Sequence, residues 1–149
     1  MKKILLILAV VFSVFSFSSC TEEPVIEAPS IVGNWKAEKV KIVEYFSNVP
    51  YYDTMVGDVS GWLGTSFYYN FKADKTFEDK SVDLKSGSVT TDGGSYNLNG
   101  TNLTLNYKNL TTQDFESVTF DAKKMIMISY DPNKNDPDRT VMTWEWSRQ

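Results

Sequence analysis

Apolar side chains recur at every second position through most of the chain after residue 30, which is the period of a β-strand. Leu103, Leu105 and Tyr107 alternate with Thr104 and Asn106 in the clearest example, and no segment carries the apolar stripe of an amphipathic helix. Successive side chains of a strand point to opposite faces, so each such segment buries one face and exposes the other. The pattern predicts an all-β domain.

Eight segments carry this alternation, and each is bounded by turn-forming residues. The Asn99-Gly100 pair is the strongest hairpin signal, because both residues tolerate the positive φ angles of a tight turn. Within the first segment, residues 37–39 predict a β-bulge. The expected strands cover residues 35–46, 66–71, 76–84, 95–98, 103–107, 115–120, 125–130 and 139–147.

The short connections between most of these strands predict how the sheet is arranged. Consecutive antiparallel strands leave two unpaired edges unless the sheet closes on itself. Eight strands close into a barrel whose interior is filled by side chains or holds one small ligand. We therefore expect an eight-stranded up-and-down antiparallel barrel over residues 31–149. An open β-sandwich is the alternative.

Residues 1–19 have the features of a secretion signal. A basic pair at the start precedes an apolar run over residues 4–17, which is shorter than the roughly 20 residues that a membrane-spanning helix needs. Two serines then lead to Cys20, the single cysteine of the chain. The segment 17–20 resembles a bacterial lipobox, which implies cleavage before Cys20 and acylation of its side chain and amino group.

Residues 20–30 are expected to form a flexible tether between this anchor and the domain, because they contain three glutamates, two prolines and little to bury. Several acyl chains on one residue hold a protein at a membrane, whereas one chain binds only marginally. Glu22-Glu23 resembles an acidic signal that exports some lipoproteins to the cell surface; a solvated tether is the alternative. We expect a lipid-anchored protein of the cell envelope, at the outer membrane.

The composition excludes several functions. The chain has no histidine, and Cys20 is committed to the lipid, so Ser-His-Asp and Cys-His catalysis and His-based metal sites are ruled out. Carboxylate pairs remain, but the alternation singles out no two of them. Without the two lysines of the signal, 13 basic residues oppose 19 acidic ones, a net charge of −6 that disfavours nucleic-acid binding. We expect neither an enzyme nor a cofactor.

Three motifs resemble those of small lipocalin-like bacterial lipoproteins. Gly33-Asn34-Trp35 is similar to the Gly-x-Trp opening of lipocalin-type barrels, in which the Trp plugs the base. Residues 71–77 resemble the Phe-x-x-Asp-(Gly/Lys)-Thr-Phe hairpin of that family, and residues 94–105 resemble its Gly-x-Tyr-x-Leu-x-Gly-x-x-Leu-x-Leu hairpin. The resemblance implies a lipocalin-like barrel and does not identify a ligand, because one fold serves many functions.

The connection over residues 47–65 is the longest between two predicted strands. Loops of this length are usually functional or disordered, and this one is too rich in aromatic and apolar residues for disorder. In a lipocalin-like barrel the first connection crosses the open mouth, which makes it a candidate lid; the alternative is that its aromatic residues only cap the core. The candidate ligand-binding residues are Tyr51, Tyr52, Trp62, Phe67 and Tyr69.

Two functions follow from these expectations. The first is a non-catalytic binding module that holds a small apolar or amphipathic molecule under the lid. The second is a structural or protein-interaction module of the envelope with a solid core and no ligand. For Trp35, Trp144 and Trp146, filling the core is favoured over lining a cavity, because large aromatic side chains usually fill a small barrel.

Overall fold

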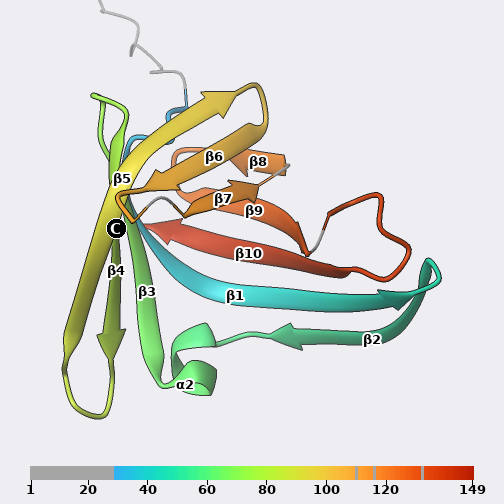
Figure 1. Cartoon of the computed structure of the whole chain (residues 1–149). Helices are drawn as coiled ribbons and strands as arrows, with labels where there is room; N and C mark the ends of the chain where they lie inside the picture. The colour runs from blue at the N-terminus through green and yellow to red at the C-terminus, as the bar shows by residue number, and fades with distance from the viewer. Residues whose placement is uncertain (1–28, 110, 116, 132) are drawn as a thin grey trace, which may run out of the picture.

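A computed structural model describes residues 29–109, 111–115, 117–131 and 133–149. The secretion signal, Cys20 and most of the tether lie outside the described residues. The described chain forms one antiparallel sheet and a short helix (Figure 1). The elements are β1 (Gly33–Phe46), β2 (Val49–Val56), α2 (Val59–Leu63), β3 (Thr65–Phe71), β4 (Thr76–Asp83), β5 (Val89–Asn99), β6 (Asn102–Tyr107), β7 (Thr112–Phe115), β8 (Ser117–Phe120), β9 (Lys124–Asp131) and β10 (Thr140–Arg148).

The sheet follows the order β7-β6-β5-β4-β3-β1-β10-β9-β8 and curves into a nearly closed barrel. Its two end strands, β7 and β8, are neighbours in sequence, and the amide of Val118 in β8 donates a 2.7 Å hydrogen bond to the carbonyl of Thr101 in the β5–β6 turn. The predicted all-β barrel is therefore confirmed.

The strand β1 connects the barrel to a projecting hairpin. One edge of β1 pairs with β10, whereas the other pairs first with β3, over residues 33–36, and then with β2, over residues 40–46. The pairing of this edge changes from β3 to β2 near the bulge between Ala37 and Lys39, where the sequence predicted a bulge. Figure 1 shows the far ends of β1 and β2 extending beyond β3 and β4.

The sheet has ten strands rather than the predicted eight. One extra strand is β2, whose residues are mostly exposed on both faces and therefore carry no alternation. The other is β7, which ends at Phe115, so the predicted strand 115–120 corresponds mainly to β8. In addition, β5 begins at Val89 instead of residue 95, because residues 89–93 pair with β4 through backbone groups while mostly exposing their side chains.

Trp35, near the start of β1, is fully buried. Its indole N–H donates a 2.7 Å hydrogen bond to the carbonyl of Ile31, and the guanidinium group of Arg148 lies 4.5 Å from its ring centroid. Arg148 also donates to the carbonyl of Val32 over 3.0 Å. These contacts fix the start of the domain against its last strand.

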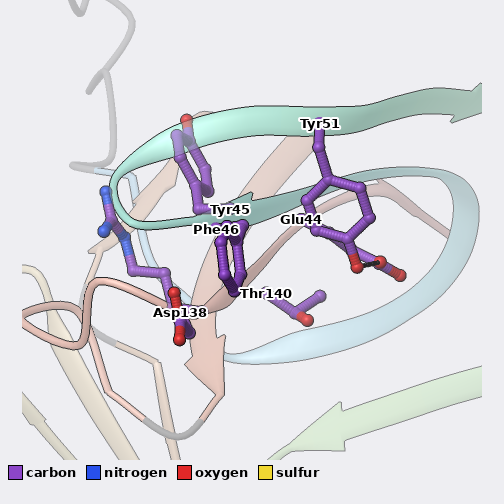
Figure 2. A pocket seen from close by; sticks show the side chains of 7 residues that line it. Glu44, Tyr45, Phe46, Tyr51, Asp138 and Thr140 are labelled. Carbon is purple, nitrogen blue, oxygen red and sulfur yellow. Dashed lines mark hydrogen bonds between the residues drawn. The ribbon is translucent and has the colours of Figure 1, made fainter.

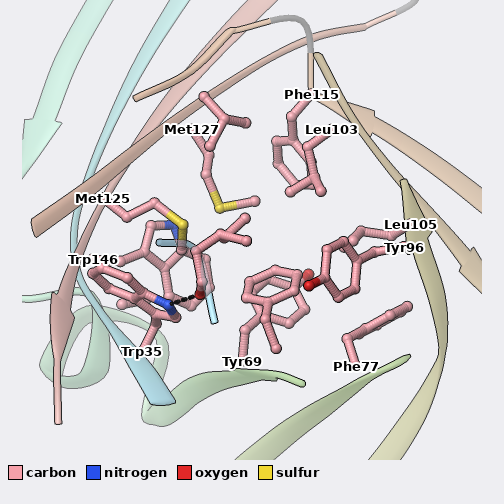
Figure 3. Close-up of a cluster of buried hydrophobic side chains, with 14 of the residues drawn as sticks. Trp35, Tyr69, Phe77, Tyr96, Leu103, Leu105, Phe115, Met125, Met127 and Trp146 are labelled. Atoms are coloured by element: carbon pink, nitrogen blue, oxygen red, sulfur yellow. Dashed lines mark hydrogen bonds between the residues drawn. The ribbon is translucent and has the colours of Figure 1, made fainter. Parts of the chain in front are cut away.

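Large apolar side chains fill the interior next to Trp35 (Figure 3). Removing this surface from water is the main favourable contribution to folding. In the described part of the chain, no helix is both long enough and apolar enough to cross a membrane. The largest fully buried side chains are Trp35, Val40, Val59, Phe71, Leu103, Leu105, Met125 and Met127.

Candidate functional site: an aromatic cavity in the barrel

Beyond the packed core, the barrel interior contains a cavity of about 210 Å³. Side chains from β3, β4, β6, β7 and β10 surround it, so its shape depends on the closure of the sheet. Most of the lining is aromatic. The lining residues are Phe67, Tyr69, Asp79, Tyr107, Gln113, Phe115, Trp144 and Trp146.

One wall of the cavity consists of rings that contact each other. Trp144 and Trp146 occupy alternate positions of β10, and their ring centroids are 6.1 Å apart. The ring of Tyr69 lies 4.9 Å from Trp146, and Phe67 meets Trp144 edge-on at 6.5 Å. Aromatic pairs contribute about 0.5–1.5 kcal/mol each beyond the burial of their area. The wall is therefore held in place without a ligand.

A chain of hydrogen bonds forms the polar side of the cavity. The hydroxyl group of Tyr107 donates to Asp79 Oδ2 over 3.0 Å, and the hydroxyl oxygens of Tyr69 and Tyr107 are 3.2 Å apart. Because the Tyr107 proton is directed at the carboxylate, Tyr69 donates to Tyr107. Asp79 is thus the final acceptor of a chain that connects β3, β6 and β4.

Tyr107 on β6 reaches across β5 to β4 because its register partner on β5 is Gly94, which has no side chain. In the sheet register Phe77 pairs with Gly94, and Gly94 pairs with Tyr107. The rings of Phe77 and Tyr107 meet perpendicularly at 5.0 Å across this position. A Cβ atom at Gly94 would lie 1.9 Å from the carbonyl oxygen of Asn106, so a larger residue cannot fit without moving β6.

The carboxyl group of Asp79 is partly buried, and none of the ion pairs in the described part of the chain includes it. Burial raises the pKa of Asp79 above its ordinary value, the hydrogen bond from Tyr107 lowers it, and the charge of Asp92 raises it. Burial also raises the pKa of the Tyr69 and Tyr107 hydroxyl groups, which therefore stay protonated at neutral pH. Among the described residues that line the cavity, the only formal charge is negative.

Three buried polar groups on β9 and β10 have no hydrogen-bond partner within the described residues. They are the indole N–H of Trp146, which lines the cavity, the Nε atom of Arg148 at the end of β10, and the hydroxyl group of Ser129 in β9, which pairs in register with Met142 of β10. Leaving such a group buried and unpaired costs about 1–3 kcal/mol. The indole N–H of Trp146 is thus an unpaired donor, and its nitrogen is itself buried.

The structure brings together two of the five predicted ligand-binding residues. Phe67 and Tyr69 line the cavity, whereas Tyr51, Tyr52 and Trp62 do not. The prediction of a long loop over residues 47–65 was wrong, because most of these residues form β2 and α2. Tyr51 and Tyr52 lie on β2 and Trp62 on α2, and all three side chains are exposed.

Local signals in the sequence specify these two elements. Ser47 and Asn48 form a tight turn with φ angles of 50° and 65°, a conformation that Asn tolerates well. Asp58 caps the start of α2 by accepting a 3.0 Å hydrogen bond from the amide of Gly61, and Gly64 ends the helix in the left-handed conformation. These turn and cap residues, and not the alternation, are the signals that could have revealed the hairpin and helix.

A second, larger hollow of about 460 Å³ lies at the tip of the hairpin (Figure 2). Several of its polar groups already have partners within the protein. Glu44 accepts a hydrogen bond from Tyr51, and Arg139 donates to Asn48 Oδ1 over 2.7 Å while its guanidinium group lies 4.3 Å from the Tyr45 ring centroid. The contacts of Arg139 tie the end of β1 and the β1–β2 turn to the segment before β10, so the hollow is the weaker candidate for a ligand site.

Sequence reasoning missed Asp79, Tyr107 and Gln113 as parts of the site. Asp79 lies two positions after the buried Phe77 and therefore on the inner face of its strand, where a charged side chain is unusual. Tyr107 continues the alternation of Leu103 and Leu105. Both signals were present in the sequence, but only the register across β5 shows that the two side chains meet.

Comparisons with known proteins agree with this architecture. The profile of a lipocalin-like domain family matches residues 31–127. A lipocalin-like protein from Bacteroides uniformis ATCC 8492 superimposes with a TM-score of 0.51 at 16% sequence identity, over 79% of this chain and 97% of that one. An uncharacterized protein from Bacteroides eggerthii DSM 20697 gives a TM-score of 0.49 at 15% identity, over 80% of this chain and 100% of that one. No curated protein matches. With the barrel in place and well over half of its length matched, the chain belongs to the lipocalin-like domain family.

Proposed function

We propose that this protein is a lipid-anchored, non-catalytic binding protein of the cell envelope that holds a small apolar or amphipathic molecule inside its barrel. The observation that carries the proposal is the cavity of about 210 Å³, whose mostly aromatic wall is interrupted by a few polar groups. Ligand sites in proteins typically have this composition, with apolar side chains for affinity and a few polar groups for orientation.

Native mass spectrometry of the protein purified from its own cells tests the binding function. We expect a bound small molecule that is lost in a variant with Trp144→Ala and retained in a control with Trp62→Ala. Trp144 lines the cavity, whereas Trp62 is exposed on α2. Retention of the molecule by the Trp144 variant, together with loss by the Trp62 variant, would contradict the proposed site.

The anchor is tested separately. In cells that express the natural chain, we expect the protein in the outer-membrane fraction with a mass that includes acyl chains on Cys20. A Cys20→Ser variant should lose both the acyl mass and the membrane association. An unmodified protein in the soluble fraction would contradict the anchor and leave the binding proposal standing.

A protein-interaction role is the second candidate function, and the hairpin favours it. β2 pairs only with β1 in the described part of the chain, and its other edge is open. Apolar side chains are exposed along it and on α2, including Val49, Tyr52, Met55 and Trp62. An open strand edge with exposed apolar side chains suits pairing with an extended segment of another protein. A photoreactive residue at Met55 should form cross-links in intact cells that Tyr52→Ser weakens.

A further inference from the structure

We infer that the cavity is selective for a small organic cation, an amine or quaternary ammonium group that the aromatic rings surround and Asp79 attracts. This inference rests on the proposed function, because it assigns a chemical class to the ligand of the same cavity. The charges, the rings and the size of the cavity carry it, each independently of the fold family.

The charge on the cavity wall has one sign. Of the residues that line the cavity, Asp79 alone is charged, and no lysine or arginine is among them. Asp92 of β5 pairs directly with Asp79 of β4 and adds a second carboxylate beside it. The nearest lysine in sequence, Lys80, has its ammonium group 5.7 Å from the Tyr68 ring, away from the cavity. Lys108 lines a neighbouring hollow with Asp92.

The rings complement this charge. Six of the eight lining residues are aromatic, and the face of an aromatic ring carries partial negative charge. A cation placed over such faces is attracted, most strongly when it is removed from water, and aromatic cages are a known means of holding quaternary ammonium groups. The wall formed by Phe67, Tyr69, Trp144 and Trp146 therefore favours the same sign of charge as Asp79.

The neighbouring carboxylates of Asp79 and Asp92 destabilise the fold. Like charges directly opposite each other on neighbouring strands destabilise a sheet, and a partly buried carboxylate without a cation has lost part of its hydration. An Asn at position 79 would keep the hydrogen bond from Tyr107 without this cost. A bound cation would offset both the repulsion between the two carboxylates and the lost hydration of Asp79. The presence of Asp rather than Asn at position 79 is therefore consistent with a cationic ligand.

Other ligand classes fit less well. An anion would be repelled by Asp79 and Asp92, and a neutral molecule would gain nothing from their charge. No group of three or more potential metal-ligating side chains occurs in the described part of the chain, so a divalent metal ion would find few ligands. The volume of about 210 Å³ is below the roughly 300–1,000 Å³ of drug-sized sites, so the cation is small.

A pair of probes with the same shape tests the inference. Choline and 3,3-dimethylbutan-1-ol differ in having a positive nitrogen or a neutral carbon at the branched centre. Nuclear magnetic resonance titrations of the purified protein would follow the indole N–H signals of Trp144 and Trp146, with exposed Trp62 as the reference. We expect choline to bind at least tenfold more tightly than the alcohol and to shift the cavity signals but not that of Trp62.

Matched variants assign the effect to Asp79. Asp79→Asn should bring the affinity ratio of the two probes close to one. Asp114→Asn removes the same charge from an exposed position on β7, where the side chain accepts a hydrogen bond from Thr104, and should leave the ratio unchanged. If Asp79→Asn does not fold, Asp92→Asn serves instead and should lower the ratio two- to threefold.

The outcomes separate this inference from the proposed function. Equal affinities for choline and the alcohol would overturn the cation preference while supporting a ligand cavity. Tighter binding of the anion 3,3-dimethylbutanoate, or shifts produced by Ca²⁺ but not by choline, would also overturn the preference. If no probe moves the signals of Trp144 and Trp146, both the preference and the proposed cavity site are wrong.

Discussion

The Tyr107 hydroxyl group donates its hydrogen bond to Asp79 across an intervening strand, joining β6 to β4 over β5 at a donor–acceptor distance of 3.0 Å. Side chains from strands two apart meet here because Gly94, the β5 residue that pairs with Tyr107, has no side chain to separate them. The contact places an acidic group inside an aromatic barrel and supplies it with one fixed donor. The polar side of the cavity depends on this arrangement.

Asp79→Asn should stabilise the protein at neutral pH by about 0.2–1 kcal/mol, the range for cross-strand charge pairs. The pKa of Asp79 in the folded state lies above the ordinary value of 3.8, so ionisation of this group costs stability as the pH rises through that interval. The gain from the variant should be complete above the folded-state pKa and absent below pH 3.8. The groups facing Asp79 are Tyr69, Tyr107 and Asp92.

Urea unfolding at a series of pH values measures this difference. A variant that is less stable than the natural protein at pH 7 would contradict the account, since it would mean that the carboxylate supports the fold. Asp114→Asn provides the control for loss of one acidic charge and should show no comparable gain.

Gly94→Ala should destabilise the protein by about 1–3 kcal/mol or more, because the added methyl group would collide with the carbonyl of Asn106. The variant should also weaken ligand binding, since moving β6 displaces Tyr107. Gly57→Ala is the control, because its Cβ would contact nothing within 4 Å, and its effect should stay within about 0.5 kcal/mol. Equal effects of the two changes on the thermal midpoint would refute the close approach at Gly94.

Trp35 and Trp144 should respond differently to truncation. Trp35→Ala removes a fully buried ring, its hydrogen bond to Ile31 and its contact with Arg148, and should cost about 3–5 kcal/mol. Trp144 is only half-buried and lines the cavity, so Trp144→Ala should cost less stability while reducing ligand affinity at least tenfold. Chemical denaturation and a binding titration on the same two variants separate these roles. A Trp144 variant with unchanged affinity would count against the site.

Trp62→Ala should change neither the stability of the protein nor its ligand affinity by much. The side chain is exposed on α2 and does not line the cavity. Its loss should alter stability by no more than about 0.5 kcal/mol, as for ordinary surface positions, and should leave ligand affinity within twofold. A tenfold loss of affinity would restore the earlier interpretation of residues 47–65 as a lid.

The alternation of the sequence predicted most of the barrel but not the hairpin. Strands such as β6 bury one face, so their apolar residues recur with period two. β2 is held by backbone hydrogen bonds to β1 and buries little on either face, so it lacks that pattern. Its signal was the turn at Ser47-Asn48, which a reading based on apolar residues passes over.

The candidate site was predictable only in part for a related reason. Alternation placed Phe67 and Tyr69 on the inner face, and Trp144 and Trp146 together on another strand. It could not show whether these rings fill the interior or leave a space, because that depends on how the sheet curves. The meeting of Asp79 with Tyr107 requires the register of three strands, which no single segment contains.

A crystal structure of the protein soaked separately in choline and in 3,3-dimethylbutan-1-ol tests the central claim most directly. The account predicts that at least one of the two occupies the space between Tyr69 and Trp144, with the choline nitrogen near the carboxylate of Asp79. A barrel interior closed by side chains, or both molecules bound only at the hairpin tip, would contradict it.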